Sequence, residues 1–478
     1  MKAYFLAGPV LAITLNVATA APQSRPNVLF IATDDLRTGV GCYGDPIAKT
    51  PNIDSLAARG VKFERAYIQQ ALCNPSRSSI MTGLRPDSLK VWDLNVHFRE
   101  TVPDVITLPQ YFRQNGYFTQ NIGKIYHNWR TKIQGDPESW SVPAFMHFAN
   151  HASDVPQIDG GTASENLSLV RGTERRDVPD EAYFDGRVAA ASIEALSMLS
   201  RESQPFFLAV GFWKPHLPFN PPKRYWDLYR EDDIPEISNP NPRAGVPSLA
   251  GHEAHEGMAD TIQDPKAHRV LRHGYYAATS FVDAQIGKVL DALDKLGLAD
   301  NTIVVLWSDH GFHLGEHGLW GKTSNYELDA RVPLIIAGHG YARGASSKAL
   351  VELLDLYPTL VDLCGLPQRT ELQGQSLKPI LVDPAQNVKA AAFTQHQRPA
   401  YGRTPGEVMG YSMRTDRYRY TEWRDWKSGS VLGLELYDHQ IDGTESVNLA
   451  GASNMISVQR DLAAQLGLQF AREPLPFQ

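Results

Sequence analysis

The 478-residue chain has few cysteines: Cys42, Cys73 and Cys364. Three scattered cysteines exclude a disulfide-rich scaffold, and the absence of a CxxC pair removes the usual cysteine signature of a zinc site. A disulfide between Cys42 and Cys364 stays open, with a buried inert thiol as the alternative for each. Cys73 has no evident partner, so its place in the sequence needs its own explanation.

The sequence also lacks a net positive charge, because its formal net charge is −7. A chain with this balance has no general cationic surface that would attract nucleic acid or anionic lipid. We therefore expect no nucleic-acid partner. An anionic substrate would have to be bound by local positive groups.

Long apolar runs are missing too, except at the N-terminus, where Lys2 precedes AYFLAGPVLAITLNVATA. The run ends in the small residues Ala18-Thr19-Ala20, which is typical of a secretory signal peptide over residues 1–20. Gly8 and Pro9 interrupt it, which favours a cleaved signal over an uncleaved membrane anchor. We expect an exported protein, periplasmic or secreted, or in a lysosome-like compartment of a eukaryote, with no membrane contact after cleavage.

Four apolar runs have the composition of buried parallel strands, and ionisable residues follow each of them. The runs are NVLFIAT before Asp34-Asp35, YFTQNIG before Lys124 and His127, PFFLAVGFW before Lys214 and His216, and NTIVVLWS before Asp309-His310. Helical patterns such as TPNIDSLAARG and TLPQYFRQNG lie between them, so we predict an α/β fold whose large, mostly parallel sheet is flanked by helices. Ligands bind beyond the carboxyl ends of such strands, which would bring the ionisable residues to one site.

The pattern changes after about Tyr401. GYSMRTDRYRYTEWRD and LGLELYDH alternate polar with aromatic or β-branched residues, as antiparallel strands do, and RDLAAQLGLQF predicts a terminal helix. We predict a catalytic domain over residues 22–400 and a smaller C-terminal antiparallel-sheet subdomain over residues 401–478. The polar, proline-rich residues 223–264 predict a long surface excursion.

Cys73 stands in the stretch ALCNPSRSSIMTG, at a predicted helix start. Asn74 suits the N-cap and Pro75 the first helical position. The first backbone amides and the Arg77 guanidinium would then face an anion beside Cys73. A thiol here is either a nucleophile whose pKa lies below its usual value of about 8.5, or a packed structural cysteine.

CNPSR fits the Cys-x-Pro-Ser-Arg signature of the type I, formylglycine-dependent sulfatases, and the chain resembles their iduronate-2-sulfatase branch in the alkaline phosphatase superfamily. The similar stretches are DDLR, GCYGD, TPNID, TGLRPD, LPQYFRQNGYFTQNIGKIYH, FWKPHLPF, SDHGFHLGEHGLWGKTSN and GYSMRTDRYRYTEW. The resemblance implies that a formylglycine-generating enzyme oxidises Cys73 to Cα-formylglycine during maturation. It also implies that one hydroxyl of the hydrated aldehyde attacks sulfur and the other expels sulfate.

The acidic residues suggest a metal. If Asp34, Asp35 and Asp309 meet near a sulfate, like charges about 5 Å apart cost on the order of 3 kcal/mol per pair at an effective dielectric near 20, and a hard divalent cation removes this repulsion. The resemblance implies Ca²⁺ at a site formed by Asp34, Asp35, Cys73, Asp309 and His310. A nitrogen ligand is unusual for calcium, so Mg²⁺ and Mn²⁺ stay open, and His310 either binds the cation or contacts the sulfate.

Lysine and histidine residues complete the predicted site. We expect Lys124, Lys214 and Lys322 to bind sulfate oxygens, whereas His127 and His216 suit proton transfer. By resemblance, His127 assists the diol, and His216 and Lys322 lie near the leaving oxygen. The predicted catalytic residues are Cys73, Arg77, Lys124, His127, His216 and Lys322, and the predicted substrate-binding residues are Lys214, Lys124, Lys322 and His216. For His313 and His317 we expect supporting roles.

The resemblance implies a hydrolase that removes O-sulfate from a sulfated carbohydrate, in the simplest case 2-O-sulfated uronic acid of glycosaminoglycan-like chains. A phosphomonoester or phosphonate monoester hydrolase on the same fold is the nearest enzymatic alternative. A non-catalytic carbohydrate-binding relative is the alternative from another class. The full set of aspartates, lysines and histidines argues against it.

Overall fold

A computed structural model of the chain describes Met1 and residues 25–127, 131–147, 162–165, 173–251, 265–401 and 407–471. Apart from Met1, the predicted signal peptide over residues 1–20 lies outside the described residues, as does the end of the predicted excursion, residues 252–264. Within the described ranges, no helix combines the length and the apolar character needed to cross a bilayer.

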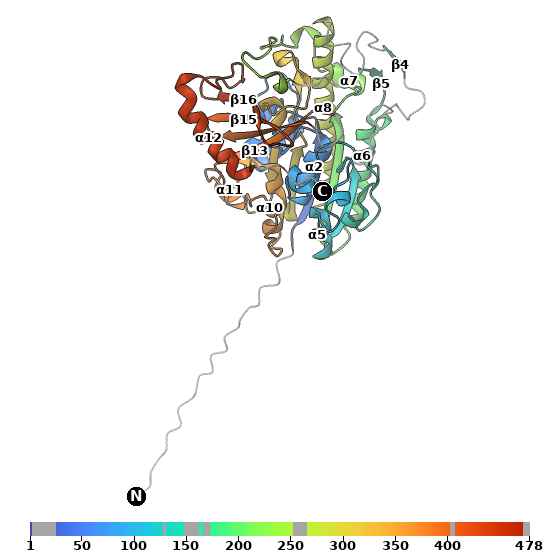
Figure 1. The fold of residues 1–478 in the computed structure, drawn as a ribbon. Coiled ribbons are helices and arrows are strands. Elements are labelled where there is room, and N and C mark those ends of the chain that lie inside the picture. Colours follow the sequence, from blue (N-terminus) through green and yellow to red (C-terminus); the bar gives the residue numbers. More distant parts are fainter. Residues whose placement is uncertain are drawn as a thin grey trace.

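An eight-stranded sheet lies at the centre of the molecule (Figure 1). Its strands run in the spatial order β10 (Arg331–Val332), β2 (Val61–Tyr67), β11 (Leu334–Ala337), β7 (Thr302–Ser308), β1 (Asn27–Asp34), β6 (Phe206–Pro215) and β3 (Phe118–Gly123), and β12 (Ala345–Glu352) also pairs with β2. The neighbours β7, β1, β6 and β3 are parallel, whereas β11 runs antiparallel to β7 and to β2. The predicted large, mostly parallel sheet is confirmed.

Helices cover both faces of this sheet, which is why its central strands are continuous apolar runs. One face packs against α1 (Pro51–Arg59), α6 (Phe184–Leu199) and α8 (Pro265–Lys295). The other face packs against α2 (Cys73–Thr82), α5 (Leu108–Gln114), α10 (Leu356–Leu363) and α11 (Lys378–Val382). Successive side chains of β1 therefore enter opposite cores: Phe30 lies in one and Ile31 in the other.

A small antiparallel sheet follows in the chain and lies beside the large one (Figure 1). Its strands are β13 (Ala391–Arg398), β14 (Val408–Thr415), β15 (Tyr418–Asp425) and β16 (Val431–Asp438), and α12 (Ile456–Gln469) packs on it. The predicted C-terminal sheet is confirmed, but it begins before the expected boundary at residue 401. β13 gave no alternating signal because its polar residues Gln395, His396 and Gln397 are all buried.

Short elements connect these parts. They are α3 (Pro86–Leu89), α4 (Phe98–Thr101), α7 (Lys223–Trp226), α9 (Glu327–Ala330), the pair β4 (Thr162–Glu165) and β5 (Arg175–Asp177), and the pair β8 (His313–Leu314) and β9 (Trp320–Gly321). The β8–β9 pair and α9 border the site described below.

A buried ion cluster joins the two sheets at the end of β12. Glu352 accepts hydrogen bonds from two nitrogens of Arg85, at 2.8 and 2.9 Å, and from Lys389 Nζ at 2.9 Å. The N–H of Phe393 in β13 donates to the same carboxylate at 3.1 Å. Burial raises the pKa of Glu352, but Arg85 and Lys389 outweigh burial and lower the pKa to about 2. The ionised carboxylate therefore stabilises the contact between the sheets.

We expect Glu352→Gln to lower the free energy of unfolding by about 3–5 kcal/mol at neutral pH, because the buried Arg85 guanidinium would lose the carboxylate that it binds and Lys389 would lose one of its two carboxylate partners, Glu352 and Asp355. The pKa of about 2 in the folded state lies below the ordinary value of 4.5. The difference between wild type and variant should thus be complete above pH 4.5 and shrink as the pH falls toward 2. Urea unfolding at several pH values measures it.

The control is Asp294→Asn, which removes an ion pair with Arg59 whose two side chains are 45% and 36% exposed. This variant should lose less than about 1 kcal/mol. Equal losses in the two variants would contradict the importance of the buried cluster.

Candidate active site

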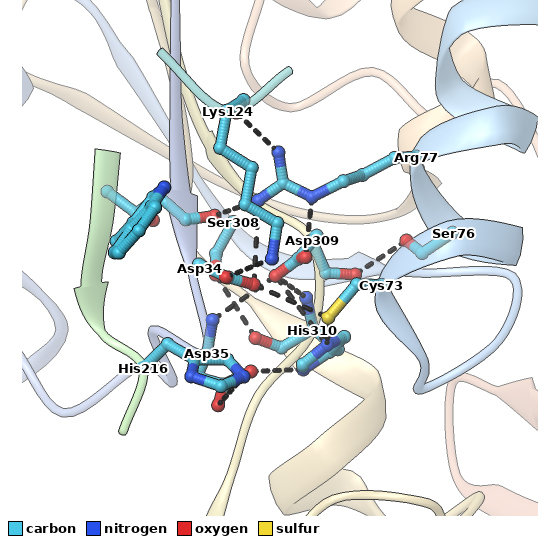
Figure 2. A network of polar contacts seen from close by, with 12 residues as sticks. Asp34, Asp35, Cys73, Ser76, Arg77, Lys124, His216, Ser308, Asp309 and His310 are labelled. Carbon is cyan, nitrogen blue, oxygen red and sulfur yellow. Dashed lines mark hydrogen bonds and ion pairs between the residues drawn. The ribbon is translucent and has the colours of Figure 1, made fainter. Parts of the chain in front are cut away.

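The carboxyl ends of the four neighbouring parallel strands meet at one place (Figure 2). β1 ends at Asp34, with Asp35 next in the chain, and β7 is followed by Asp309 and His310. β3 and β6 deliver Lys124 and His216 to the same edge. The structure thus brings together residues that lie up to 276 positions apart in the chain, as parallel strand ends do.

α2 begins at Cys73 and brings the sulfur of this residue to the strand ends. Leu72 is the N-cap residue and makes no side-chain capping bond. The expected cap at Asn74 is wrong: Asn74 Nδ2 donates to the carbonyls of Asp93 and Val96, at 2.8 Å each. The Asn74 side chain therefore ties α2 to the loop that follows α3, and the helix starts one residue before the predicted cap.

Four of the predicted metal ligands form a tight group. One ligand atom from each of Asp34, Asp35, Cys73 and His310 lies within 4.8 Å of the others. Cys73 Sγ is 3.5 Å from Asp34 Oδ1 and 3.3 Å from His310 Nε2. Among the described residues, Asp35 Oδ2 is buried without a hydrogen-bond partner. A hard cation would satisfy this oxygen, so the donor set fits a divalent metal ion.

Asp309 lies beside this group and holds its parts together. Its Oδ1 accepts hydrogen bonds from the backbone N–H groups of Asp35, at 3.2 Å, and His310, at 3.0 Å. Its Oδ2 accepts from Arg77 Nε at 2.7 Å, and its carbonyl accepts from Ser76 Oγ at 2.6 Å. One residue therefore links β1, β7 and α2.

Three buried cations face the three aspartates. Arg77 pairs with Asp309 and also donates to the carbonyls of Thr33, Lys124 and Ile125. Lys124 Nζ donates to Asp34 Oδ2, and Lys322 Nζ donates to Asp35 Oδ1 at 2.7 Å and lies 3.5 Å from Cys73 Sγ. Two of the three lysines expected on sulfate oxygens, Lys124 and Lys322, thus contact carboxylates, because opposite charges attract strongly in a buried site.

Burial and charge give neighbouring groups different pKa values. Burial raises the pKa of Asp34, but Lys124, His216 and other cations outweigh it, so the pKa lies well below its ordinary value. Burial raises the pKa of Asp35 to about 6, although Lys322 opposes the shift. Burial and the Lys124 ammonium hold the pKa of His127 well below its ordinary value. Asp34 is therefore ionised and His127 neutral at neutral pH.

Lys214 lies at the end of β6, and His216 is the first residue after this strand. His216 Nδ1 lies 2.6 Å from the carbonyl of Leu217, and its Nε2 is 3.8 Å from Asp35 Oδ2. Lys214 Nζ donates to the carbonyls of His216, at 3.2 Å, and Pro218, at 2.7 Å. These contacts orient the His216 imidazole, because a carbonyl beside Nδ1 favours a proton on that nitrogen.

Sequence reasoning missed two hydroxyl groups that hold the turn after β1. Asp35 has a φ of 66°, a conformation that residues other than glycine seldom adopt. The Tyr275 hydroxyl donates to the Asp35 carbonyl at 2.8 Å and accepts from Arg37 N–H at 3.0 Å, while Ser308 Oγ accepts from Leu36 N–H at 2.9 Å. Tyr275 lies in α8, far along the chain from the turn that it holds.

All three cysteines are free thiols, so the disulfide left open between Cys42 and Cys364 does not form. Cys73 is only 2% exposed. Burial, followed by the Asp34 carboxylate, raises the pKa of the Cys73 thiol. Of the two alternatives left open for the thiol, the packed cysteine fits, because desolvation and negative charge outweigh the helix start and the nearby cations. As a plain thiol, Cys73 is a poor nucleophile.

Two family models match the chain. The model named Sulfatase covers residues 26–366, and the model of the N-sulphoglucosamine sulphohydrolase C-terminal region covers residues 315–471. The chain belongs to the sulfatase family. Its sequence and fold place this sulfatase among the type I enzymes of the alkaline phosphatase superfamily, which hydrolyse sulfate esters.

Individual relatives agree with this assignment. This sulfatase is 34% identical to the iduronate 2-sulfatase of Mus musculus over 465 residues, which cover 83% of this chain and 84% of the relative. A solved 2-O GAG sulfatase is 25% identical, with a TM-score of 0.75, covering 94% of this chain and 92% of that one. The phosphonate monoester hydrolase of Agrobacterium radiobacter is 24% identical, with a TM-score of 0.75 over 93% of this chain and 96% of that one. The last likeness shows a shared fold alone.

We expect this sulfatase to resist alkylation at residue 73 whenever it is folded with an unmodified thiol there. Burial and the raised thiol pKa keep the reactive thiolate rare near pH 7.5. The measurement is mass spectrometry of the tryptic peptide of residues 66–77 after iodoacetamide treatment of native and urea-unfolded protein. Labelling should need urea. Rapid labelling of native protein would contradict the buried, protonated thiol.

Proposed function

We propose that this sulfatase removes an O-sulfate from a sulfated carbohydrate, and that the substrate is a 2-O-sulfated uronic acid of glycosaminoglycan-like chains. The observation that carries the proposal is the set of contacts around Cys73 Sγ, which lies 3.5 Å from Asp34, 3.3 Å from His310 and 3.5 Å from Lys322. The names of the mouse relative and of the solved 2-O GAG sulfatase support the sugar and the sulfate position.

We propose further that Cys73 acts as Cα-formylglycine, produced by a formylglycine-generating enzyme. The CNPSR stretch supports this conversion, and so does the raised pKa of the thiol, which leaves the unmodified side chain unreactive. As its hydrate, formylglycine supplies one hydroxyl that attacks sulfur and a second that drives release of sulfate. The surrounding side chains would orient that group and the sulfate.

The donor set supports a divalent cation, which we propose is Ca²⁺, with Mg²⁺ and Mn²⁺ as alternatives. Asp34, Asp35, Asp309, His310 and the oxidised side chain at position 73 would hold it. A bound cation supplies fixed positive charge toward the sulfate oxygens. Because it would also neutralise Asp34 and Asp35, we propose that Lys124 and Lys322 then turn their positive charge to the sulfate.

In this proposal, His127 transfers a proton at position 73, and either His216 or Lys322 transfers one to the leaving oxygen. Neutral His127 suits removal of a proton from a hydroxyl at position 73. His216 and Lys322 suit the leaving oxygen, to which one of them would supply a proton. Lys214 donates to the carbonyls of His216 and Pro218, so it would orient His216 and need not touch the substrate. Arg77 holds Asp309 and so supports the ligand set.

The remaining assignments concern the whole chain. We propose that residues 1–20 are a cleaved signal peptide, that the protein is exported to a periplasmic, extracellular or lysosome-like compartment, and that it then acts without membrane or nucleic acid. We propose residues 22–400 as the catalytic domain, with β13 shared with the small sheet of the C-terminal subdomain.

We expect Cys73→Ala to lower turnover of an aryl sulfate by at least about 10³-fold, because no nucleophile would remain at position 73. The matched control is Cys364→Ala, which removes a buried cysteine in the core beside α10 and should keep wild-type turnover. Rates on an aryl sulfate and the corresponding aryl phosphate test the reaction type. Wild-type turnover in Cys73→Ala, or a strong preference for the phosphate, would refute the proposal.

Among defined disaccharides, we expect 2-O-sulfated uronic acid at the non-reducing end to give a kcat/KM at least about tenfold above that of 6-O-sulfated glucosamine, because a site that hydrogen-bonds one sugar leaves polar groups unpaired with another. Released sulfate measures both rates. The opposite preference would reject the uronic acid assignment and leave the sulfatase assignment intact.

A further inference from the structure

Lys322 lies between two residues with unusual backbone conformations. Gly321 has a φ of 100° and Thr323 a φ of 90°. Glycine adopts positive φ freely, but a β-branched residue does so at a cost of about 1–3 kcal/mol. Thr323 is also fully buried, so its side chain has no open space in which to rearrange. The backbone beside a buried lysine of the site therefore needs other groups to hold it.

The carboxylate of Asp329 contacts both sides of this segment. Asp329 lies in α9 and is fully buried. Its Oδ2 accepts from the N–H of Ser324 at 3.0 Å and from Ser324 Oγ at 2.5 Å. Its Oδ1 lies 2.6 Å from His313 Nδ1, and His313 pairs with Gly321 in the β8–β9 ladder. The same side chain therefore holds the residues on either side of Lys322 and Thr323.

The main chain of Asp329 reaches the metal-ligand group as well. Its carbonyl accepts from the N–H of Gly311, the residue after His310, at 2.8 Å. The two segments approach so closely that a Cβ atom on Gly311 would lie 2.0 Å from the carbonyl oxygen of Leu328. α9 and the loop after β7 are thus packed without room for displacement.

We propose that Asp329 is a positioning residue for Lys322: through Ser324 and His313 it keeps Thr323 in its strained conformation, so that Lys322 Nζ reaches Asp35 and Cys73. The inference rests on the role of Lys322 in the proposed function. Asp329 itself acts only through its neighbours. In this proposal His313 connects Asp329 to Gly321. His317 instead contacts the carbonyls of Asn241 and Thr444.

The experiment is a double-mutant cycle of Asp329→Asn and Lys322→Ala, with kcat and KM for an aryl sulfate measured on holoenzyme whose conversion at residue 73 has been checked by mass spectrometry. Asparagine keeps the size of the side chain, but its amide NH2 group would face hydrogen-bond donors, such as the N–H and hydroxyl of Ser324, where the carboxylate accepts. Asp329→Asn alone should lower kcat roughly 10- to 100-fold with little change in KM. In the Lys322→Ala background it should lower kcat further by less than about threefold.

Equal factors in the two backgrounds would overturn the proposal, because Asp329 would then act independently of Lys322. Wild-type kcat in Asp329→Asn would overturn it too. The proposed function is tested separately. Wild-type turnover in both Lys322→Ala and Cys73→Ala would refute the proposed active site, whatever the result for Asp329.

A second test addresses folding. Thr323→Gly removes the cost of positive φ at residue 323. If Asp329→Asn alone lowers kcat a hundredfold, the double variant Asp329→Asn with Thr323→Gly should have a kcat at least tenfold higher than the single variant. The control is Asp283→Asn, which alters a buried carboxylate that accepts the N–H groups of Asn52 and Ile53 at the start of α1. This control should lower the Tm and keep kcat. Folded double variants without recovery would overturn the proposal.

Discussion

Compensation of charge in a buried site is the constraint on which the rest of this structure depends. Asp34, Asp35 and Asp309 are all at most 1% exposed, and each faces a cation drawn from another part of the chain. Arg77 comes from α2, Lys124 from the end of β3 and Lys322 from the segment after β9. Because an uncompensated buried charge is so costly, these pairings hold α2, the strand ends and the β8–β9 pair in one arrangement.

The fold supplies the geometry that this compensation requires. Parallel neighbours β7, β1, β6 and β3 end at one edge, so the residues after them share a small volume. Hydroxyl groups then set the details: Tyr275 and Ser308 hold the turn at Asp35, and Ser324 holds the turn after Lys322. Side chains outside the reacting group thereby hold Asp35 and Thr323, the residue after Lys322, in backbone conformations that residues other than glycine seldom adopt.

The parts of this arrangement that follow local rules could be predicted. Buried strands are readable as apolar runs, and ionisable residues after several such runs indicate a shared edge, which located Asp34, Asp309 and Lys124. Cys73 could be singled out because CNPSR is a specific signature. The start of α2 was misplaced because Asn74 binds distant carbonyls instead of its own helix. The choice between an activated and a packed thiol could not be made from the sequence, because burial and the Asp34 charge depend on tertiary structure. Tyr275 gave no signal because it binds Asp35 from far along the chain, and Asp329 gave none because its contacts to Ser324 and His313 depend on how that segment folds.

The burial of α2 bears on whether Cys73 could be modified before or after the protein folds. All ten residues of the helix are buried, and Arg77, the last residue of the CNPSR stretch, is enclosed by Asp309 and three carbonyls. Under the proposed conversion, a modifying enzyme would have to reach this stretch before α2 packs into the core. On that proposal, a chain that folded first would enclose an unmodified Cys73 thiol, which is 2% exposed in the folded protein.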